Sequence, residues 1–148
     1  MSPKPPRITR RKKALREQVA AWRDAGEKLA LVPTMGALHE GHLALVTAAK
    51  KRADRVGVSI FVNPTQFAPN EDFSRYPRDE RGDARKLASV GTDLIYLPSP
   101  AEIYPNGFAT RVTVEGPARA GLEDAHRPHH FGGVATVVAK LLVVLLPE

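Results

Sequence analysis

Two short apolar runs with one helix-length segment between them constrain the fold of this 148-residue chain most strongly. Residues 29–32 (LALV) and 56–62 (VGVSIFV) are nearly all apolar, as are strands that are covered on both faces. Residues 41–52 lie between the two runs and place Leu43, Val46 and Ala49 three apart, which predicts an amphipathic helix. The order strand, helix, strand predicts a right-handed βαβ unit with a parallel sheet.

The same periodicities predict the remaining elements. Residues 1–8 are rich in proline and are expected to be extended or flexible, and Thr9 is expected to cap a helix at 10–25 that stops at Gly26. The other expected elements are a helix at 79–91, a strand at 93–97, a half-exposed strand at 110–114, and a last helix with apolar residues at helical spacing from Val134 to Leu145.

The composition indicates one globular domain over residues 1–148, with 43% hydrophobic and 26% charged residues. The absence of cysteine excludes disulfides and thiolate metal sites and favours the cytoplasm. The N-terminus lacks the apolar segment of a secretory signal, and the longest apolar stretch, 134–146, is interrupted by Lys140. We therefore expect neither secretion nor a membrane partner.

The net charge of +6 is concentrated near the N-terminus, where seven basic residues precede the first acidic one. These residues are Lys4, Arg7, Arg10, Arg11, Lys12, Lys13 and Arg16. The rest of the chain sums to −1, so the basic arm is typical of a solvated face. We expect no nucleic-acid partner, and binding of nucleic acid through the arm is kept as an alternative.

Residues 33–42 (PTMGALHEGH) connect the first predicted strand to the first βαβ helix. Gly36 and Gly41 allow a ligand to approach the backbone closely. His39 and His42 are three apart, so they lie on one face of a helical turn, where the helix N-terminus favours phosphate. The stretch predicts a nucleotide phosphate site in which imidazoles donate to phosphoryl oxygens.

Other interpretations of this stretch are weighed against that one. The spacing of HEGH differs from the HExxH of zinc proteases, no GK[ST] of a P-loop follows, and the GxGxxG turn is absent. A simple strand-to-helix turn whose histidines cap the helix remains the structural alternative.

The second predicted strand ends in polar residues, Asn63 and Gln66. Because ligands of open parallel sheets bind beyond the carboxyl ends of the strands, both predicted strands deliver polar groups to one edge. Gln66 can donate and accept hydrogen bonds, which suits a hydroxy acid or an amide, whereas Asn-Pro is also a common turn. The cluster His126, His129 and His130 lacks a recognised metal-ligand spacing and is interpreted as a loop.

Four segments in this order, PTMGALHEGH, SIFVNPTQF, NEDFSRYPRD and HRPHHFGGVATVVAKL, resemble the N-terminal, nucleotide-binding domain of the pantothenate synthetase (pantoate–β-alanine ligase) family. The resemblance covers residues 15–142. It implies an α/β, Rossmann-like nucleotidylyl-transferase (HxGH) domain with a parallel sheet flanked by helices. It also implies ATP-dependent condensation of pantoate with β-alanine through a pantoyl-adenylate, with ATP and Mg²⁺ as cofactors. Separately, an open sheet edge and the apolar tail favour self-association, and a homodimer is the expected assembly.

The resemblance also implies roles for individual residues, with no protein ligand assigned to a metal. His42 is the expected general acid, with His39 beside it on the phosphates, and Tyr76 lies in a loop that covers the site. The implied ATP-binding residues are Met35, Gly36, Ala37, Leu38, His39, Glu40, Gly41 and His42. The implied pantoate and β-alanine residues are Gln66, Asn63, Phe61, Val134 and Val137.

The chain departs from the family pattern at its end, because it stops before the GEKD segment and the C-terminal domain with its KMS-type loop. Asp124, His126, His129 and Gly132 also differ from the residues common in the family. The expected function is therefore that of a truncated ligase domain with weak or no activity. The alternative is a catalytically inactive nucleotide-binding or interaction module.

Overall fold

A parallel sheet forms the centre of the computed structural model, which describes residues 2–116, 120–121, 125 and 127–145. Within these residues the sheet has four strands in the order β1-β4-β3-β2, and every neighbouring pair is parallel. The strands are β1 (Arg7–Thr9), β2 (Leu29–Thr34), β3 (Arg55–Ile60) and β4 (Leu94–Tyr96). The predicted α/β fold with a parallel sheet is confirmed.

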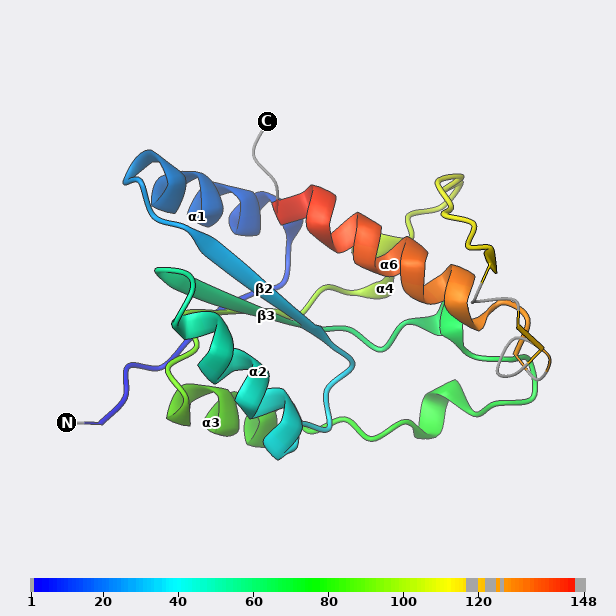
Figure 1. The fold of residues 1–148 in the computed structure, drawn as a ribbon, viewed down its shortest axis with the longest axis horizontal. Coiled ribbons are helices and arrows are strands. Elements are labelled where there is room, and N and C mark those ends of the chain that lie inside the picture. Colours follow the sequence, from blue (N-terminus) through cyan, green and yellow to red (C-terminus); the bar gives the residue numbers. More distant parts are fainter. Residues whose placement is uncertain (1, 117–119, 122–124, 126, 146–148) are drawn as a thin grey trace.

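Helices cover both faces of the sheet (Figure 1), as a mostly apolar parallel sheet requires. The described helices and short 3-10 turns are α1 (Lys12–Asp24), α2 (Glu40–Lys50), η1 (Pro64–Gln66), η2 (Phe73–Arg75), α3 (Glu80–Ser89), α4 (Pro100–Ile103) and α6 (His130–Leu145). In Figure 1, α1 and α6 lie on one side of the sheet, and α2 and α3 lie on the other. None of the described helices combines the length and the apolar character that a membrane span needs.

Two hydrophobic cores follow from this layering, because successive residues of a strand point to opposite faces. On the α1 and α6 side, Leu94 and Phe61 pack with Leu15 and Leu141. On the α2 and α3 side, the core contains Val32, Val46, Val56, Val58 and Leu87, among others. The strand residues that were predicted to be apolar on both faces therefore divide between the two cores.

The N-terminal prediction was wrong in part. Residues 7–9 form the edge strand β1, which pairs in parallel with β4, and Thr9 therefore does not cap a helix. Helix α1 begins at Lys12 after Arg11, and it ends before Gly26, as predicted, with Gly26 at φ 77°. A three-residue strand whose partner is more than 80 residues away leaves no periodic signal in the sequence.

The strand predicted at 110–114 is also absent from the part of the chain that the structure describes. Its backbone instead contacts helix α6, where the Val112 amide donates to the Thr136 hydroxyl at 2.9 Å. Alternation of apolar and polar residues is equally satisfied by an extended segment that packs on a helix.

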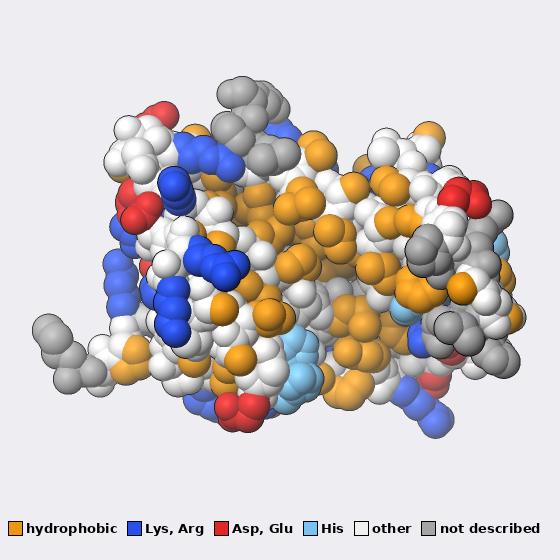
Figure 2. Space-filling model, in the orientation of Figure 1, with side chains coloured by type: hydrophobic (Ala, Val, Ile, Leu, Met, Phe, Trp, Pro, Cys, Tyr) orange, Lys and Arg blue, Asp and Glu red, His pale blue; other side chains and the backbone are white. Residues whose placement is uncertain are grey.

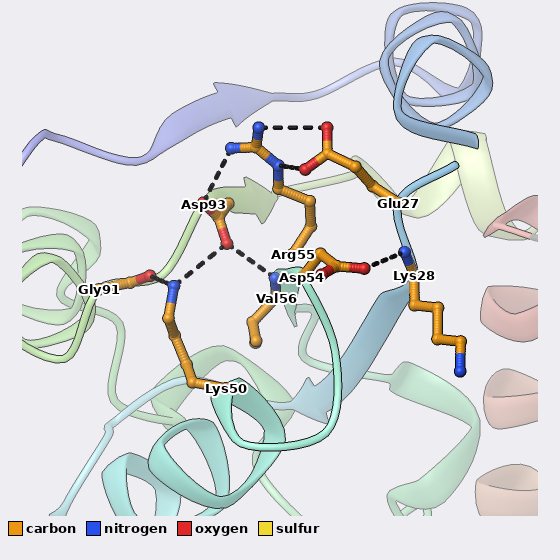
Figure 3. Close-up of polar contacts among 8 residues, drawn as sticks. All are labelled: Glu27, Lys28, Lys50, Asp54, Arg55, Val56, Gly91 and Asp93. Atoms are coloured by element: carbon orange, nitrogen blue, oxygen red, sulfur yellow. Dashed lines mark hydrogen bonds and ion pairs between the residues drawn. The ribbon is translucent and has the colours of Figure 1, made fainter. Parts of the chain in front are cut away.

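Ion pairs close the pole of the sheet at which the strands begin (Figure 3). The Arg55 guanidinium donates to Glu27 at 2.6 and 3.2 Å and to Asp93 at 3.4 Å, while Asp93 accepts from the Val56 amide at 2.8 Å. Lys50 adds a 3.5 Å ion pair to Asp93. These charged groups use one another as hydrogen-bond partners. Donors for a polar ligand are therefore more available at the opposite pole, where the strands end.

Candidate functional site

The segment 33–42 leaves the carboxyl end of β2 and enters helix α2, as predicted. The Thr34 hydroxyl donates to the Ser59 carbonyl at 2.9 Å and accepts from the Gly36 amide at 3.2 Å, which ties the turn to β3. Gly36 has φ 83°, a left-handed conformation that favours glycine. The segment is thus fixed at the edge where ligands of parallel sheets bind.

His39 and His42 form a reciprocal cap at the N-terminus of α2. The His39 Nδ1 accepts from the Gly41 amide at 3.0 Å, and the His42 Nδ1 accepts from the His39 amide at 3.2 Å. The two rings are in contact, with their centroids 4.2 Å apart and their planes tilted by 46°. The structural alternative, in which the histidines cap the helix, is therefore correct as far as their Nδ1 atoms are concerned.

This cap determines which imidazole nitrogens carry protons. A nitrogen that accepts from an amide cannot itself be protonated, so each neutral ring carries its proton on Nε2. Burial lowers the pKa of His42 below its ordinary value of 6.5, the charge of His39 acts in the same direction, and Asp83 opposes both. His42 is therefore a neutral ring at pH 7, with one N–H that it can donate to an anion.

The glycine between the two histidines has a steric cause. A Cβ at position 41 would lie 2.9 Å from Cε1 and 3.1 Å from Nδ1 of His39. Only glycine at position 41 leaves room for the His39 ring over the first turn of α2, where the ring accepts from the Gly41 amide. The glycine of the HxGH motif is thus a condition for the contact between the two rings.

Two residues of α3 that the sequence analysis did not identify hold this segment. The Asp83 carboxylate is 2% exposed and accepts from the amides of Ala37 at 3.1 Å and Leu38 at 3.0 Å. The Lys86 ammonium donates to the Leu38 carbonyl at 2.8 Å. Their only sequence signal is an Asp and a Lys three apart on a predicted helix, which is typical of solvated faces.

These bonds change how the predicted ATP-binding residues are interpreted. The Leu38 side chain belongs to the α2 and α3 core, and both of its backbone polar groups contact α3. The Ala37 amide likewise donates to Asp83, whereas Glu40 is exposed on the first turn of α2. The donors that this segment presents to a ligand are therefore mainly the two imidazoles.

Asn63 and Gln66 follow β3 and form a second polar group at the same edge of the sheet. The Asn63 amide donates to the Gln66 side-chain oxygen at 2.8 Å and to the Gly133 carbonyl at 3.1 Å. Its oxygen accepts from the Thr65 hydroxyl at 2.9 Å and from the Tyr104 hydroxyl at 2.8 Å. Asn63 is fully buried and positions η1, while Gln66 keeps its own side-chain amide group for a ligand.

The two polar groups follow adjacent strands, because the Phe61 amide, just after β3, donates to the Thr34 carbonyl at the end of β2 at 3.0 Å. Phe61 and Val137 are almost fully buried in one core cluster, whereas Val134 is half-buried. Phe61 also lines a cavity of about 300 Å³ together with Met35 and Gly36. The predicted apolar wall therefore consists mainly of core residues, with Val134 the more accessible one.

The loop predicted to be a flap, 70–78, has a small aromatic cluster of its own. Phe67 makes edge contacts with Phe73 and Tyr76, with centroids 5.3 and 5.9 Å apart. The Arg78 guanidinium lies 4.9 Å from the Phe73 ring and donates to the carbonyls of residues 73, 74 and 76. Residues 77–80 border the cavity that Met35 lines.

The described residues contain no group of three or more histidine, cysteine, aspartate or glutamate side chains placed to hold a metal ion. His130 contacts the Gln66 carbonyl through Nδ1 at 3.3 Å, and His129 is exposed. His126 and Asp124 lie outside the described residues. In Figure 2, histidine side chains over the N-terminus of α2 border an apolar surface that continues toward α6.

Comparison with known proteins gives consistent results. The family model for pantoate-beta-alanine ligase matches residues 7–148. A pantothenate synthetase of Bradyrhizobium sp. strain BTAi1 is 58% identical over 143 residues, which are 97% of this chain and 50% of that protein. One from Paramagnetospirillum magneticum is 60% identical over 141 residues, which are 95% and 49% of the two chains.

Solved structures agree in fold. The pantothenate synthetase of Thermus thermophilus superposes with a TM-score of 0.87 at 48% identity, over 96% of this chain and 50% of that one. The ligase of Francisella tularensis, complexed with beta-gamma ATP and beta-alanine, has a TM-score of 0.87 at 41% identity, over 95% and 53%. The chain thus spans about half the length of the relatives that it matches.

Proposed function

This chain belongs to the pantoate-β-alanine ligase family, and we propose that it supplies the nucleotide- and pantoate-binding half of the ATP-dependent condensation of pantoate with β-alanine. The observation that carries the proposal is the reciprocally capped pair His39 and His42, which follows β2 at the carboxyl edge of the sheet. Each ring bonds a backbone amide through Nδ1 and keeps Nε2–H for an anion.

The proposed reaction proceeds through a pantoyl-adenylate. A carboxylate oxygen of pantoate attacks the α-phosphorus of ATP, the bond from phosphorus to the bridging oxygen breaks, and pyrophosphate leaves. The β-alanine amine then attacks the acyl carbon, loses a proton, and expels AMP. Negative charge grows on phosphoryl oxygens in the first step, and preformed donors such as the two Nε2–H groups stabilise it, each by about 10²–10³ in rate.

Gln66 is proposed to bind pantoate and then β-alanine, with Asn63 fixing its position. The Asn63 amide donates to the Gln66 oxygen, so the Gln66 NH₂ group remains as a donor to a carboxylate or hydroxyl. Val134 and Phe61 are proposed to supply the apolar contact that the methyl groups of pantoate need. We propose Tyr76 and the loop 70–78 as the cover that excludes water.

Mg²⁺ is proposed to arrive with the triphosphate. Mg²⁺ in ATP sites is held by substrate phosphates, waters and only one or two carboxylates, so it does not require a dedicated cluster of protein ligands. The ion would supply neutralisation of phosphate charge, while the imidazoles direct the oxygens.

We further propose that the protein acts in the cytoplasm as a homodimer. Leu142 and Val143 are 46% and 60% exposed on α6, and large exposed apolar side chains favour association. The mass in dilute solution measures the assembly, and a monomer at all concentrations would contradict this part of the proposal.

Calorimetric titration with MgATP tests the nucleotide site. We expect saturable binding by this chain that is lost in the double variant His39→Ala/His42→Ala, and absence of binding to the wild type would contradict the proposal. Release of AMP with pantoate and β-alanine present then distinguishes a ligase from the alternative, a nucleotide-binding module without catalysis.

A further inference from the structure

Asp83 is the one buried charged residue among the described residues, and the proposed chemistry does not use it. It is 2% exposed, yet its two oxygens accept from two successive amides, those of Ala37 and Leu38, at 3.1 and 3.0 Å. One helical turn later, Lys86 donates to the Leu38 carbonyl at 2.8 Å. Three hydrogen bonds therefore connect α3 to a single stretch of two residues, more than 40 positions earlier in the chain.

That stretch has a backbone conformation that needs external support. Gly36 has φ 83° and Ala37 has φ 51°, and Ala37 is the only residue other than glycine with positive φ among the described residues. Successive amides in such a turn converge on one point and form a concavity that binds an anion. Here the Asp83 carboxylate occupies it, so these amides face the protein and not the ligand.

The position of the imidazoles depends on this arrangement. His39 follows Leu38 directly, and the His39 amide donates to the His42 Nδ1 at 3.2 Å. A rotation of the peptide units that carry the Ala37 and Leu38 amides would therefore turn the next unit, which carries the His39 amide, and release the His42 ring. A buried charge is costly unless it is well bonded, so an aspartate here is better explained by a need for rigid geometry than by stability.

We propose that Asp83 is a positioning residue of the nucleotide site, which fixes the direction of the two imidazoles through the amides of Ala37 and Leu38. This inference rests on the function proposed above for the same site. Lys86 assists by holding the Leu38 carbonyl, which belongs to the same peptide unit as the His39 amide.

The test compares Asp83→Asn with a matched control, Asp93→Asn. Both aspartates accept from a backbone amide, but Asp93 lies at the opposite pole of the sheet, where it holds the Val56 amide at 2.8 Å (Figure 3). Asparagine keeps one acceptor and places an NH₂ group against the second amide. We expect Asp83→Asn to weaken MgATP binding at least about tenfold, since a small misplacement is costly, and Asp93→Asn to leave it within about twofold.

Long-range ¹H–¹⁵N spectra of the imidazoles supply a readout that does not need ATP. In the wild type we expect the Nε2–H form of His42, and in Asp83→Asn a mixture of both tautomers, while Asp93→Asn keeps the wild-type spectrum. Unchanged ring spectra in a folded Asp83→Asn protein, or equal losses of ATP affinity in the two variants, would overturn the inference.

The two proposals fail in distinguishable ways. Absence of ATP binding by the wild type overturns the nucleotide function, whereas the ring spectra still decide the role of Asp83. If Asp83→Asn does not fold, the exposed Lys86→Met variant decides, with a smaller change in the same direction expected. Wild-type ring spectra in Lys86→Met would then count against the inference.

Discussion

The Nδ1 atoms of His39 and His42 accept from backbone amides, so the chemistry available to a ligand resides in the two Nε2 atoms. The sequence predicted that His39 and His42 lie together, although His39 is the extended residue before α2 and the pair meets through the reciprocal cap. It could not predict the tautomer, which depends on the extended backbone of His39 directly before α2. Asp83 was missed because its partners are amides, which carry no sequence signal.

His42→Asn separates the structural role of this residue from its chemical role. The asparagine oxygen can replace Nδ1 as acceptor for the His39 amide, but no atom reaches the position of Nε2. We expect a free energy of unfolding within about 0.5 kcal/mol of the wild type and AMP release lower by about 10²–10⁴. His42→Ala should lose the same activity and in addition about 1 kcal/mol of cap stability. Unchanged turnover in His42→Asn would remove the proposed role.

Gly41→Ala should increase helix propensity and reduce MgATP affinity. Alanine gains up to about 1 kcal/mol over glycine in a helix, but its Cβ would lie 2.9 Å from Cε1 of His39 and displace that ring. We expect a melting temperature close to that of the wild type and MgATP affinity reduced about tenfold. Gly132→Ala is the control, because a Cβ there meets nothing closer than 3.8 Å, and it should leave affinity unchanged.

The stability of the fold should depend on pH through His42. Its pKa in the folded chain is lowered below 6.5, chiefly by burial, so the unfolded chain binds more protons just below that pH. The contribution of neutral His42 to the free energy of unfolding is fully present above pH 6.5 and is lost as pH falls through the lowered pKa. Urea unfolding between about pH 5 and pH 7.5 measures it, and we expect a smaller decrease in His42→Asn. An equal decrease in both proteins would contradict the lowered pKa.

At the scale of elements, periodicity predicted the segments that bury one face and missed those defined by distant partners. The strands β2, β3 and β4 and the helices α2, α3 and α6 were predicted, with ends shifted by a few residues in several cases. Strand β1 was missed because only pairing with β4 defines it. The segment around Val112 was predicted to be a strand because apolar and polar residues alternate in it. In the structure its backbone contacts α6 instead.

We predict that Arg78 holds the loop 70–78 in its conformation. This guanidinium donates to three carbonyls of the loop and lies over the Phe73 ring, whereas Arg75 makes an ion pair with Asp72 and is 87% exposed. Because hydrogen bonds to charged groups contribute about 1.5–3 kcal/mol each at most, Arg78→Met should raise amide exchange at residues 73–76 by about tenfold or more. The melting temperature should change little, and Arg75→Met should alter neither quantity. Equal exchange in both variants would show that Arg78 does not hold the loop.

At the scale of the molecule, the two poles of the sheet differ in what they leave unused. Ion pairs among Arg55, Glu27 and Asp93 satisfy the pole where strands begin, whereas imidazole and amide donors remain at the pole where they end. The general rule for parallel sheets predicted this polarity, and the conformation of the segment 33–42 and its connection to α3 required the structure.

The interaction of ATP with the two Nε2 atoms is the central claim, and imidazole ¹H–¹⁵N spectra recorded during titration with MgATP test it most directly. We expect saturable shifts at Nε2 of both His39 and His42, no shift of the exposed His129, and a rise in the pKa of His42 as phosphate charge approaches. Spectra of His39 and His42 that stay unchanged at saturating ATP would contradict the claim.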